Sequence, residues 1–131
     1  MVEKIEIENK LLAVIIRKDY KSTGIEFFTP KDFSQQLGYM FRQKGYKIKP
    51  HNHIPFSRNI FYTKEVLFIK SGKIKIDIYN EDKVFFTSTE LYAGDTILLA
   101  FGGHGIEVIE DSEIIEVKQG PYAGELDKEF F

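Results

Sequence analysis

The chain has 131 residues, no cysteine and a formal net charge of −2, with acidic and basic residues interspersed. This length fits a single domain, and the lack of cysteine excludes disulfides, zinc–thiolate clusters and a thiol nucleophile. The sequence shows neither the basic face that nucleic-acid binding needs nor an apolar run of the ~20 residues that cross a bilayer. Because the N-terminus lacks the apolar core of a signal peptide, we expect a cytoplasmic protein that binds neither nucleic acid nor membranes.

Taken in chain order, the sequence predicts nine or ten short strands and one or two short helical turns. Aromatic residues make up 15% of the chain, and their abundance together with Ile and Val favours β-structure. The strand candidates are residues 11–16, 25–28, 37–42, 46–49, 66–69, 73–79, 84–86, 96–99, 106–109 and 114–117. The helical-turn candidates are residues 30–34 and 124–131, and the turns between strands are placed at residues 80–83, 93–95 and 110–112.

The clearest alternation lies in residues 73–79, where isoleucines share one face and charged side chains share most of the other. With the turn at residues 80–83 and the strand that follows, this stretch predicts a β-hairpin. Many short strands with turns between them are typical of a β-sandwich or barrel. Neither a repeat nor a linker divides the chain, so we expect one domain over residues 1–131.

All three histidines follow strand-like stretches. His51 and His53 are two residues apart, and side chains at that spacing project from the same face of an extended segment. His104 lies in a glycine-rich segment after another strand candidate. Two imidazoles on one strand face can point into one cavity and bind one metal ion, so the histidines are the first candidates for a functional site.

The spacing of glycines, histidines and one glutamate around this pair forms two motifs. The residues of the first motif are Gly45, His51, His53, Glu65 and Gly72. The residues of the second are Gly94, Gly102 and His104. These motifs resemble those of the cupin superfamily, and among cupins the small single-domain RmlC-like proteins. The resemblance extends from Gly45 to about Val117.

The resemblance implies an all-β cupin double-stranded β-helix, a jelly-roll barrel closed around a pocket, which is often a homodimer. It also implies a metal-binding site whose ligands are His51, His53, Glu65 and His104. Imidazole and carboxylate ligands suit a divalent transition metal such as Fe, Mn, Ni, Zn or Co. Without a metal, the same three histidines are the catalytic candidates, because imidazole donates and accepts protons near neutral pH.

Four further residues are candidates for contacts with a small-molecule ligand: Arg58, Tyr62, Lys118 and Gln119. Arg58 and Tyr62 lie in a loop inserted between His53 and Glu65, and loops beside a barrel mouth often contact substrate. An arginine can hold a phosphate or carboxylate through two hydrogen bonds, but an ordinary surface role fits Arg58 equally well. Lys118 and Gln119 end the last predicted strand, where a lid, a dimer contact or a plain strand exit are the alternatives.

By analogy with other small cupins, the resemblance implies an enzyme that acts on a small, polar, sugar-like substrate by isomerase or epimerase chemistry. An iron-dependent dioxygenase is the alternative within the enzymes, because two histidines and a carboxylate also bind Fe(II). A non-catalytic ligand-binding or sensor protein is the alternative from another class. A barrel with a decayed site is the last alternative, because Ala100 replaces the proline of the second motif and His104 comes one residue early.

Overall fold

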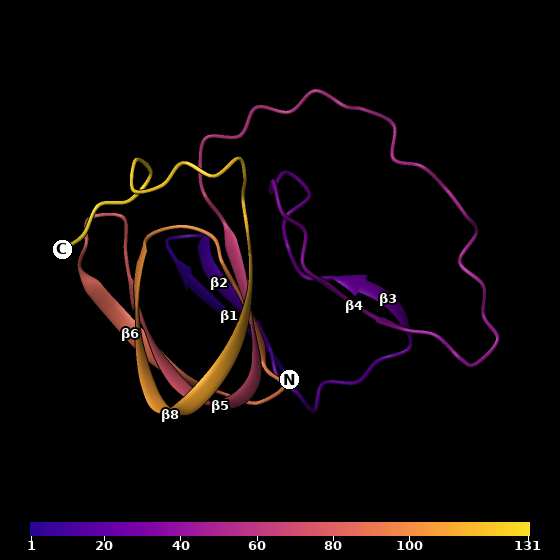
Figure 1. Cartoon of the computed structure of the whole chain (residues 1–131), viewed down its shortest axis with the longest axis horizontal. Coiled ribbons are helices and arrows are strands. Elements are labelled where there is room, and N and C mark those ends of the chain that lie inside the picture. Colours follow the sequence, from indigo (N-terminus) through magenta and orange to yellow (C-terminus); the bar gives the residue numbers. More distant parts are fainter.

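The computed structural model describes residues 1–131 and contains eight strands and no helix. The strands are β1 (Val2–Ile7), β2 (Lys10–Ile16), β3 (Gly24–Phe27), β4 (Gly38–Phe41), β5 (Glu65–Tyr79), β6 (Phe85–Tyr92), β7 (Thr96–Leu99) and β8 (Gly103–Lys118). Six of them form one antiparallel sheet that curls into a half-barrel, and β3 and β4 form a separate hairpin beside it (Figure 1). The prediction of an all-β chain is confirmed.

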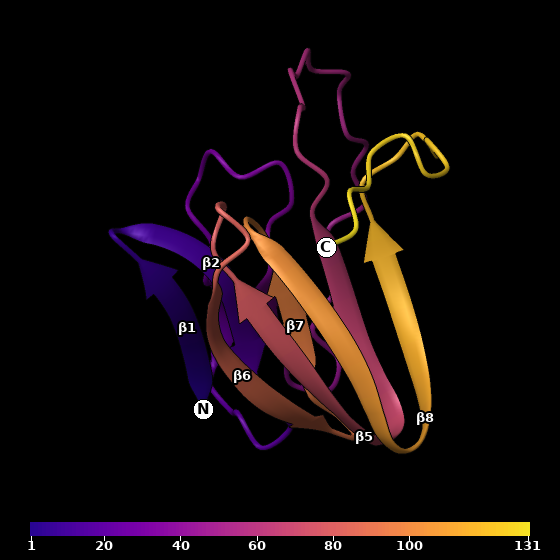
Figure 2. The same cartoon turned by 90° about the vertical axis from the view of Figure 1, so that its left-hand side faces the viewer.

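Strand β5 is the centre of the large sheet. Its first part, Glu65 to Phe68, pairs with β7, and its last part, Lys73 to Tyr79, pairs with β6. Along its other edge it pairs with β8 over nearly its whole length (Figure 2). The order β1-β2-β7-β5-β6, with β8 attached to β5 alone, leaves the second edge of β8 without a partner strand.

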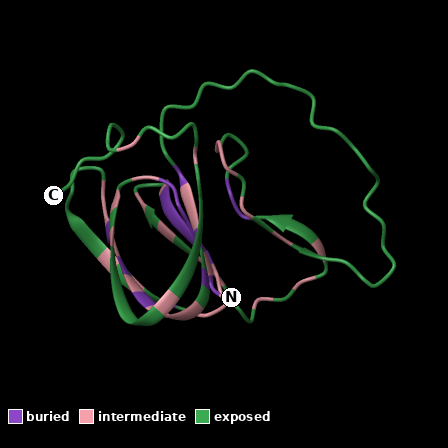
Figure 3. Ribbon diagram, viewed as in Figure 1, coloured by how far each residue is buried: buried purple, intermediate pink, exposed green.

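The core lies on the concave face of the curled sheet. Ile74, Ile76 and Ile78 are at most 1% exposed, which confirms the alternation predicted for β5. Strand β2 is buried on both faces, because the concave core covers one side and a smaller cluster around Phe28 covers the other. Buried residues therefore concentrate around β2, β5 and β7, whereas most of β8 is exposed (Figure 3).

Two sets of predicted elements were wrong. Residues 30–34 and 124–131 form turns rather than helices, with isolated bonds such as Phe33 N to Pro30 O at 3.1 Å. One turn fixes several residues for a single hydrogen bond, so such short helices are unstable without packing. The predicted turn at residues 110–112 is an irregularity within the continuous strand β8, because β5 provides a partner on both sides of it and Ser112 bonds to Lys73.

The predicted strand at residues 46–49 is absent, and these residues belong to a long connection between β4 and β5. We call residues 42–63 the arm. Every residue of the arm is exposed, and it arcs away from the half-barrel before returning to the start of β5 (Figure 1). At that point Gln119 N donates to Lys64 O at 3.0 Å, so the arm ends beside the last residues of β8.

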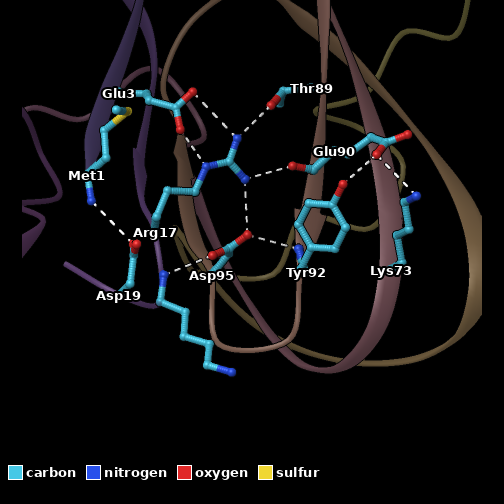
Figure 4. Close-up of polar contacts among 10 residues, drawn as sticks. Met1, Glu3, Arg17, Asp19, Lys73, Thr89, Glu90, Tyr92 and Asp95 are labelled. Atoms are coloured by element: carbon cyan, nitrogen blue, oxygen red, sulfur yellow. Dashed lines mark hydrogen bonds and ion pairs between the residues drawn. The ribbon is translucent and has the colours of Figure 1, made fainter.

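A polar network centred on Asp95 joins the turn before β7 to the end of β2 (Figure 4). The side chain of Asp95 is 4% exposed and accepts hydrogen bonds from Lys18 N, Tyr92 N and Arg17 Nη1 at 2.9–3.0 Å. Arg17 in turn donates to Glu3 and Thr89. The network therefore connects strands β1, β2 and β6 at the end of the sheet opposite the arm.

No helix is present that is long and apolar enough to cross a membrane.

Candidate functional site

The first residue of β5 and the second residue of β8 meet at the open end of the half-barrel. In the strand register, Glu65 lies opposite Lys118, and His104 lies opposite Ile78 at the other end of β5. The curl of the two strands nevertheless brings His104 Nε2 to 2.6 Å from Glu65 Oε1. Both side chains are partly shielded from solvent, with 18% of Glu65 and 31% of His104 exposed.

Two further side chains, Glu116 and Lys118, add charge next to this pair. They are two residues apart on β8 and share the face of the sheet that carries Glu65. Lys118 Nζ lies 3.4 Å from Glu116 Oε1. The resulting cluster of two carboxylates, one imidazole and one ammonium group lies at the mouth of the concave face.

The mouth holds the Glu65 carboxyl in its ionised form. The hydrogen bond from His104 lowers the pKa of Glu65 to about 2, against the opposing effect of burial, and contact with Glu116 lowers it further. The hydrogen bond with Glu65 raises the pKa of Glu116. The pKa of Lys118 is raised by the neighbouring Glu116 charge. At neutral pH the site therefore presents an anion at Glu65 and a cation at Lys118.

A cavity of about 490 Å³ opens at this cluster. Its wall includes Tyr62, Glu65, Phe101, His104, Lys118 and Phe131. Aromatic rings meet edge to face on both sides, with centroids 5.1 Å apart for Tyr62 and Phe101 and 5.1 Å apart for Tyr79 and Phe131. Five of the sixteen residues that line the cavity are hydrophobic, so its wall is mostly polar and charged and suits a polar ligand.

The C-terminal segment forms part of the cavity wall. Thr63 Oγ1 donates to Asp127 Oδ2 at 2.9 Å, and Lys83 Nζ pairs with Glu129 at 2.5 Å. The ring of Phe131 lies against Gly103, where a Cβ atom would come within 2.6 Å of it. The C-terminal phenylalanines suggested that the tail docks on the barrel or on a partner subunit, but its place in the cavity wall could not be predicted, because it depends on the curl of the sheet. Glu116 was missed, although its spacing of two from Lys118 was a usable signal.

The predicted metal ligands are only partly brought together. Glu65 and His104 meet at the cavity, whereas His51 and His53 lie on the exposed arm with their ring centroids 5.2 Å apart. No group of three His, Cys, Asp or Glu side chains is close enough to hold a metal ion. A transition-metal site normally needs at least three protein ligands, so the present arrangement does not fit one, and the metal stays a prediction.

The predicted ligand-binding residues divide in the same way. Tyr62 and Lys118 line the cavity. Arg58 lies on the arm, where its guanidinium group is 5.1 Å from the Phe56 ring centroid and donates to Phe56 O at 3.3 Å. Gln119 is next to the cavity but not in its wall, and its buried Oε1 has no hydrogen-bond partner.

The low pKa of Glu65 predicts a specific acid sensitivity. Its carboxyl has a folded-state pKa of about 2 and an ordinary value of 4.5, so ionisation stabilises the fold above about pH 5 and this contribution is lost between pH 4.5 and 2. Glu116, whose pKa shifts upward, subtracts from the effect. Between pH 5 and 2, the free energy of unfolding of Glu65→Gln should therefore fall by about 2 kcal/mol less than that of the wild type. Urea unfolding at each pH measures the difference.

Glu107→Gln is the matched control, because the Glu107 side chain is 63% exposed and pairs with Lys75 away from the mouth. The free energy of unfolding of Glu107→Gln should depend on pH as that of the wild type does. Parallel stability curves for Glu65→Gln and the wild type would contradict the ionised Glu65 described above.

Comparison with known proteins adds no assignment: no family model, no curated protein and no solved structure matches this chain.

Proposed function

We propose that the cavity binds a small, polar, sugar-like carbonyl compound and that His104, positioned by Glu65, moves a proton on it, as isomerases and epimerases do. The observation that carries this proposal is the 2.6 Å contact between His104 Nε2 and Glu65 Oε1 in the cavity wall. A carboxylate that fixes one imidazole nitrogen leaves the other free to exchange a proton with a ligand.

The direction of this hydrogen bond defines the role of each group. Because Glu65 is ionised, its oxygen accepts and Nε2 of His104 donates, so Nδ1 of a neutral His104 carries the free lone pair. Nδ1 can then take a proton from the hydroxyl-bearing carbon next to a carbonyl group and return a proton to the former carbonyl carbon, while the hydroxyl proton passes to the former carbonyl oxygen. Glu65 stabilises the imidazolium that forms in between, and acts here as a positioning residue.

The rest of the cavity suits the same substrate class. Lys118 supplies a positive charge close to Glu65, and a cation next to the developing enolate oxygen stabilises the intermediate. The rings of Phe101 and Tyr62 provide an apolar wall against which the C–H face of a sugar can pack. The reaction needs no redox partner, since removing one proton and returning another from the solvent-exchanged imidazole leaves the overall oxidation level of the compound unchanged.

The finer fold assignment belongs to the same proposal. A cupin-type jelly roll is built from two sheets; the half-barrel provides one curled sheet, and its Glu65 and His104 belong to the two motifs that resemble this family. A complete jelly roll would need further strands along the free edge of β8.

Proton exchange with solvent tests the proposed chemistry directly. The protein is incubated in D₂O with a panel of aldoses, ketoses and their phosphates, and deuterium at the carbon next to the carbonyl group is followed by NMR. Incorporation above the protein-free rate supports the proposal. Binding across the panel without incorporation would contradict it and identify a ligand-binding or sensor protein.

The metal predicted from the motifs requires His51 and His53 to reach the mouth. If they do reach it, protein purified without added metal will contain a near-stoichiometric transition metal, and the His51→Ala/His53→Ala double variant will lose it, as measured by elemental analysis. Lys47→Ala, on the same arm, is the control and should keep the metal. Metal-free protein whose melting temperature does not change when metals are added would contradict this prediction.

A further inference from the structure

Acidic and basic residues are interspersed over much of the chain, but two segments carry opposite net charge. Residues 33–64 contain six Lys or Arg side chains and no Asp or Glu. Residues 103–131 contain eight Asp or Glu side chains and two Lys. The first segment includes the whole arm, and the second begins with the whole of β8. The two parts of the fold that lack partners therefore carry opposite charge.

Strand β8 offers a long edge for another strand. It pairs with β5 alone, so the backbone groups along its second edge are free. On its concave face Ile106 and Val108 are 45% and 58% exposed, although their partners on β5 are fully buried. Glu110 and Asp111 lie midway along this strand and take part in no ion pair. The edge thus combines free backbone groups, exposed apolar side chains and unpaired negative charge.

The arm has the complementary properties. Its only backbone hydrogen bond runs from Tyr46 N to Gln43 O at 3.1 Å. Its first eight residues carry four cations, which are Arg42, Lys44, Lys47 and Lys49. Ile48 is 57% exposed. Within residues 46–49 aromatic or aliphatic side chains alternate with lysines, as in a strand with one buried face, and Pro50 ends the segment because it cannot donate to a ladder.

We propose that residues 42–49 add to the free edge of β8 as a further strand of the same chain and so close the open side of the half-barrel. The lysines then approach Glu110 and Asp111, while the alternate apolar side chains extend the concave core. Addition to an exposed sheet edge is a common way to bind an extended segment.

The covalent connection favours the arm of the same chain over that of a second copy. The arm ends just before Lys64, whose carbonyl accepts a hydrogen bond from Gln119 on the β5 side of β8, so the far end of the arm lies near one end of the strand it would join. A short tether of this kind gives an effective concentration on the order of millimolar.

Disulfide trapping tests the strand addition. Because the chain has no cysteine of its own, only the introduced thiols can cross-link. Ile48→Cys is combined with Ile106→Cys on the concave face of β8, and in the control with Phe86→Cys on β6, a similarly exposed position (45% and 46%). Under mild oxidation we expect the β8 pair to cross-link within one chain about tenfold faster than the β6 pair, read on non-reducing gels. Cross-linked dimers in place of monomers, or equal rates for the two pairs, would overturn the proposal.

A charge exchange separates this mechanism from unspecific contact. In the cross-linking background, Lys47→Glu/Lys49→Glu should slow formation of the monomeric disulfide, as should about 1 M salt, which screens charges beyond about 3 Å. Adding Glu110→Lys/Asp111→Lys should restore the rate. All four positions are exposed, so the fold is retained. A rate that does not respond to either exchange would overturn the proposal, whether or not the protein turns over any sugar.

Discussion

Replacing Asp95 with alanine is expected to lower the free energy of unfolding by about 3 kcal/mol, because it removes one of the two carboxylates that pair with the partly buried Arg17. Asp95 is 4% exposed, and the Arg17 side chain facing it is 21% exposed. The substitution also removes the acceptor for the backbone N–H groups of Lys18 and Tyr92. Hydrogen bonds to a charged group contribute about 1.5–3 kcal/mol each, and their effects overlap. Chemical unfolding monitored by circular dichroism measures the change.

Two comparisons make this result specific to the network. Asp95→Asn should lower the free energy of unfolding by about half as much as Asp95→Ala, because an amide oxygen still accepts hydrogen bonds but carries no charge. Asp19→Ala removes an ion pair with the terminal amine whose two groups are 76% and 86% exposed, and it should change stability by less than about 0.5 kcal/mol. A loss at Asp95 no larger than that at Asp19 would show that the network does not hold the strand ends together.

The second large effect concerns turnover. On whichever sugar-like compound shows proton exchange, we expect His104→Gln to lower kcat by about 10²–10⁴, the usual contribution of a general base. Glu65→Gln should lower kcat as well and also change the pH profile, because an amide no longer stabilises the imidazolium and can donate to Nε2, which fixes the other tautomer. Steady-state kinetics over a range of pH measures both.

Glu107→Gln is again the appropriate control for turnover, since Glu107 points away from the mouth toward Lys75 and should leave kcat unchanged. The pH profile distinguishes a positioning role for Glu65 from a purely structural one. If Glu65→Gln reduced kcat in proportion to a loss of folded protein, with an unchanged pH profile, the proposed role of the pair would be wrong.

The sequence was most informative where a pattern is local. The isoleucine alternation in residues 73–79 predicted both the strand and its buried face, and Glu65 and His104 were each chosen as site residues. Their direct contact could not be predicted, because it depends on how far β5 and β8 curl together. The surroundings of Lys64 could not be predicted either. Its Nζ lies 4.6 Å from the centroid of the Phe101 ring, and burial lowers the pKa of this lysine.

Residues 46–49 show the opposite case. Their alternation is typical of a strand, and the prediction was wrong for the described structure because no neighbouring strand pairs with them. A strand needs a partner as well as a pattern, and the pattern does not say which partner it will be. The apolar side chains of β8 show the same limit: Ile106 and Val108 look like core residues in the sequence yet remain about half exposed.

The position of the arm has a consequence for how the molecule divides. A cut within residues 42–63 would break no backbone hydrogen bond between strands, yet it would separate β1 to β4 from β5 to β8. The two pieces would remain joined by the pairing of β2 with β7 and by a core to which Leu12, Ala13 and Ile15 contribute from the first piece. The protein can thus be regarded as two complementary fragments, suited to reassembly as a split reporter.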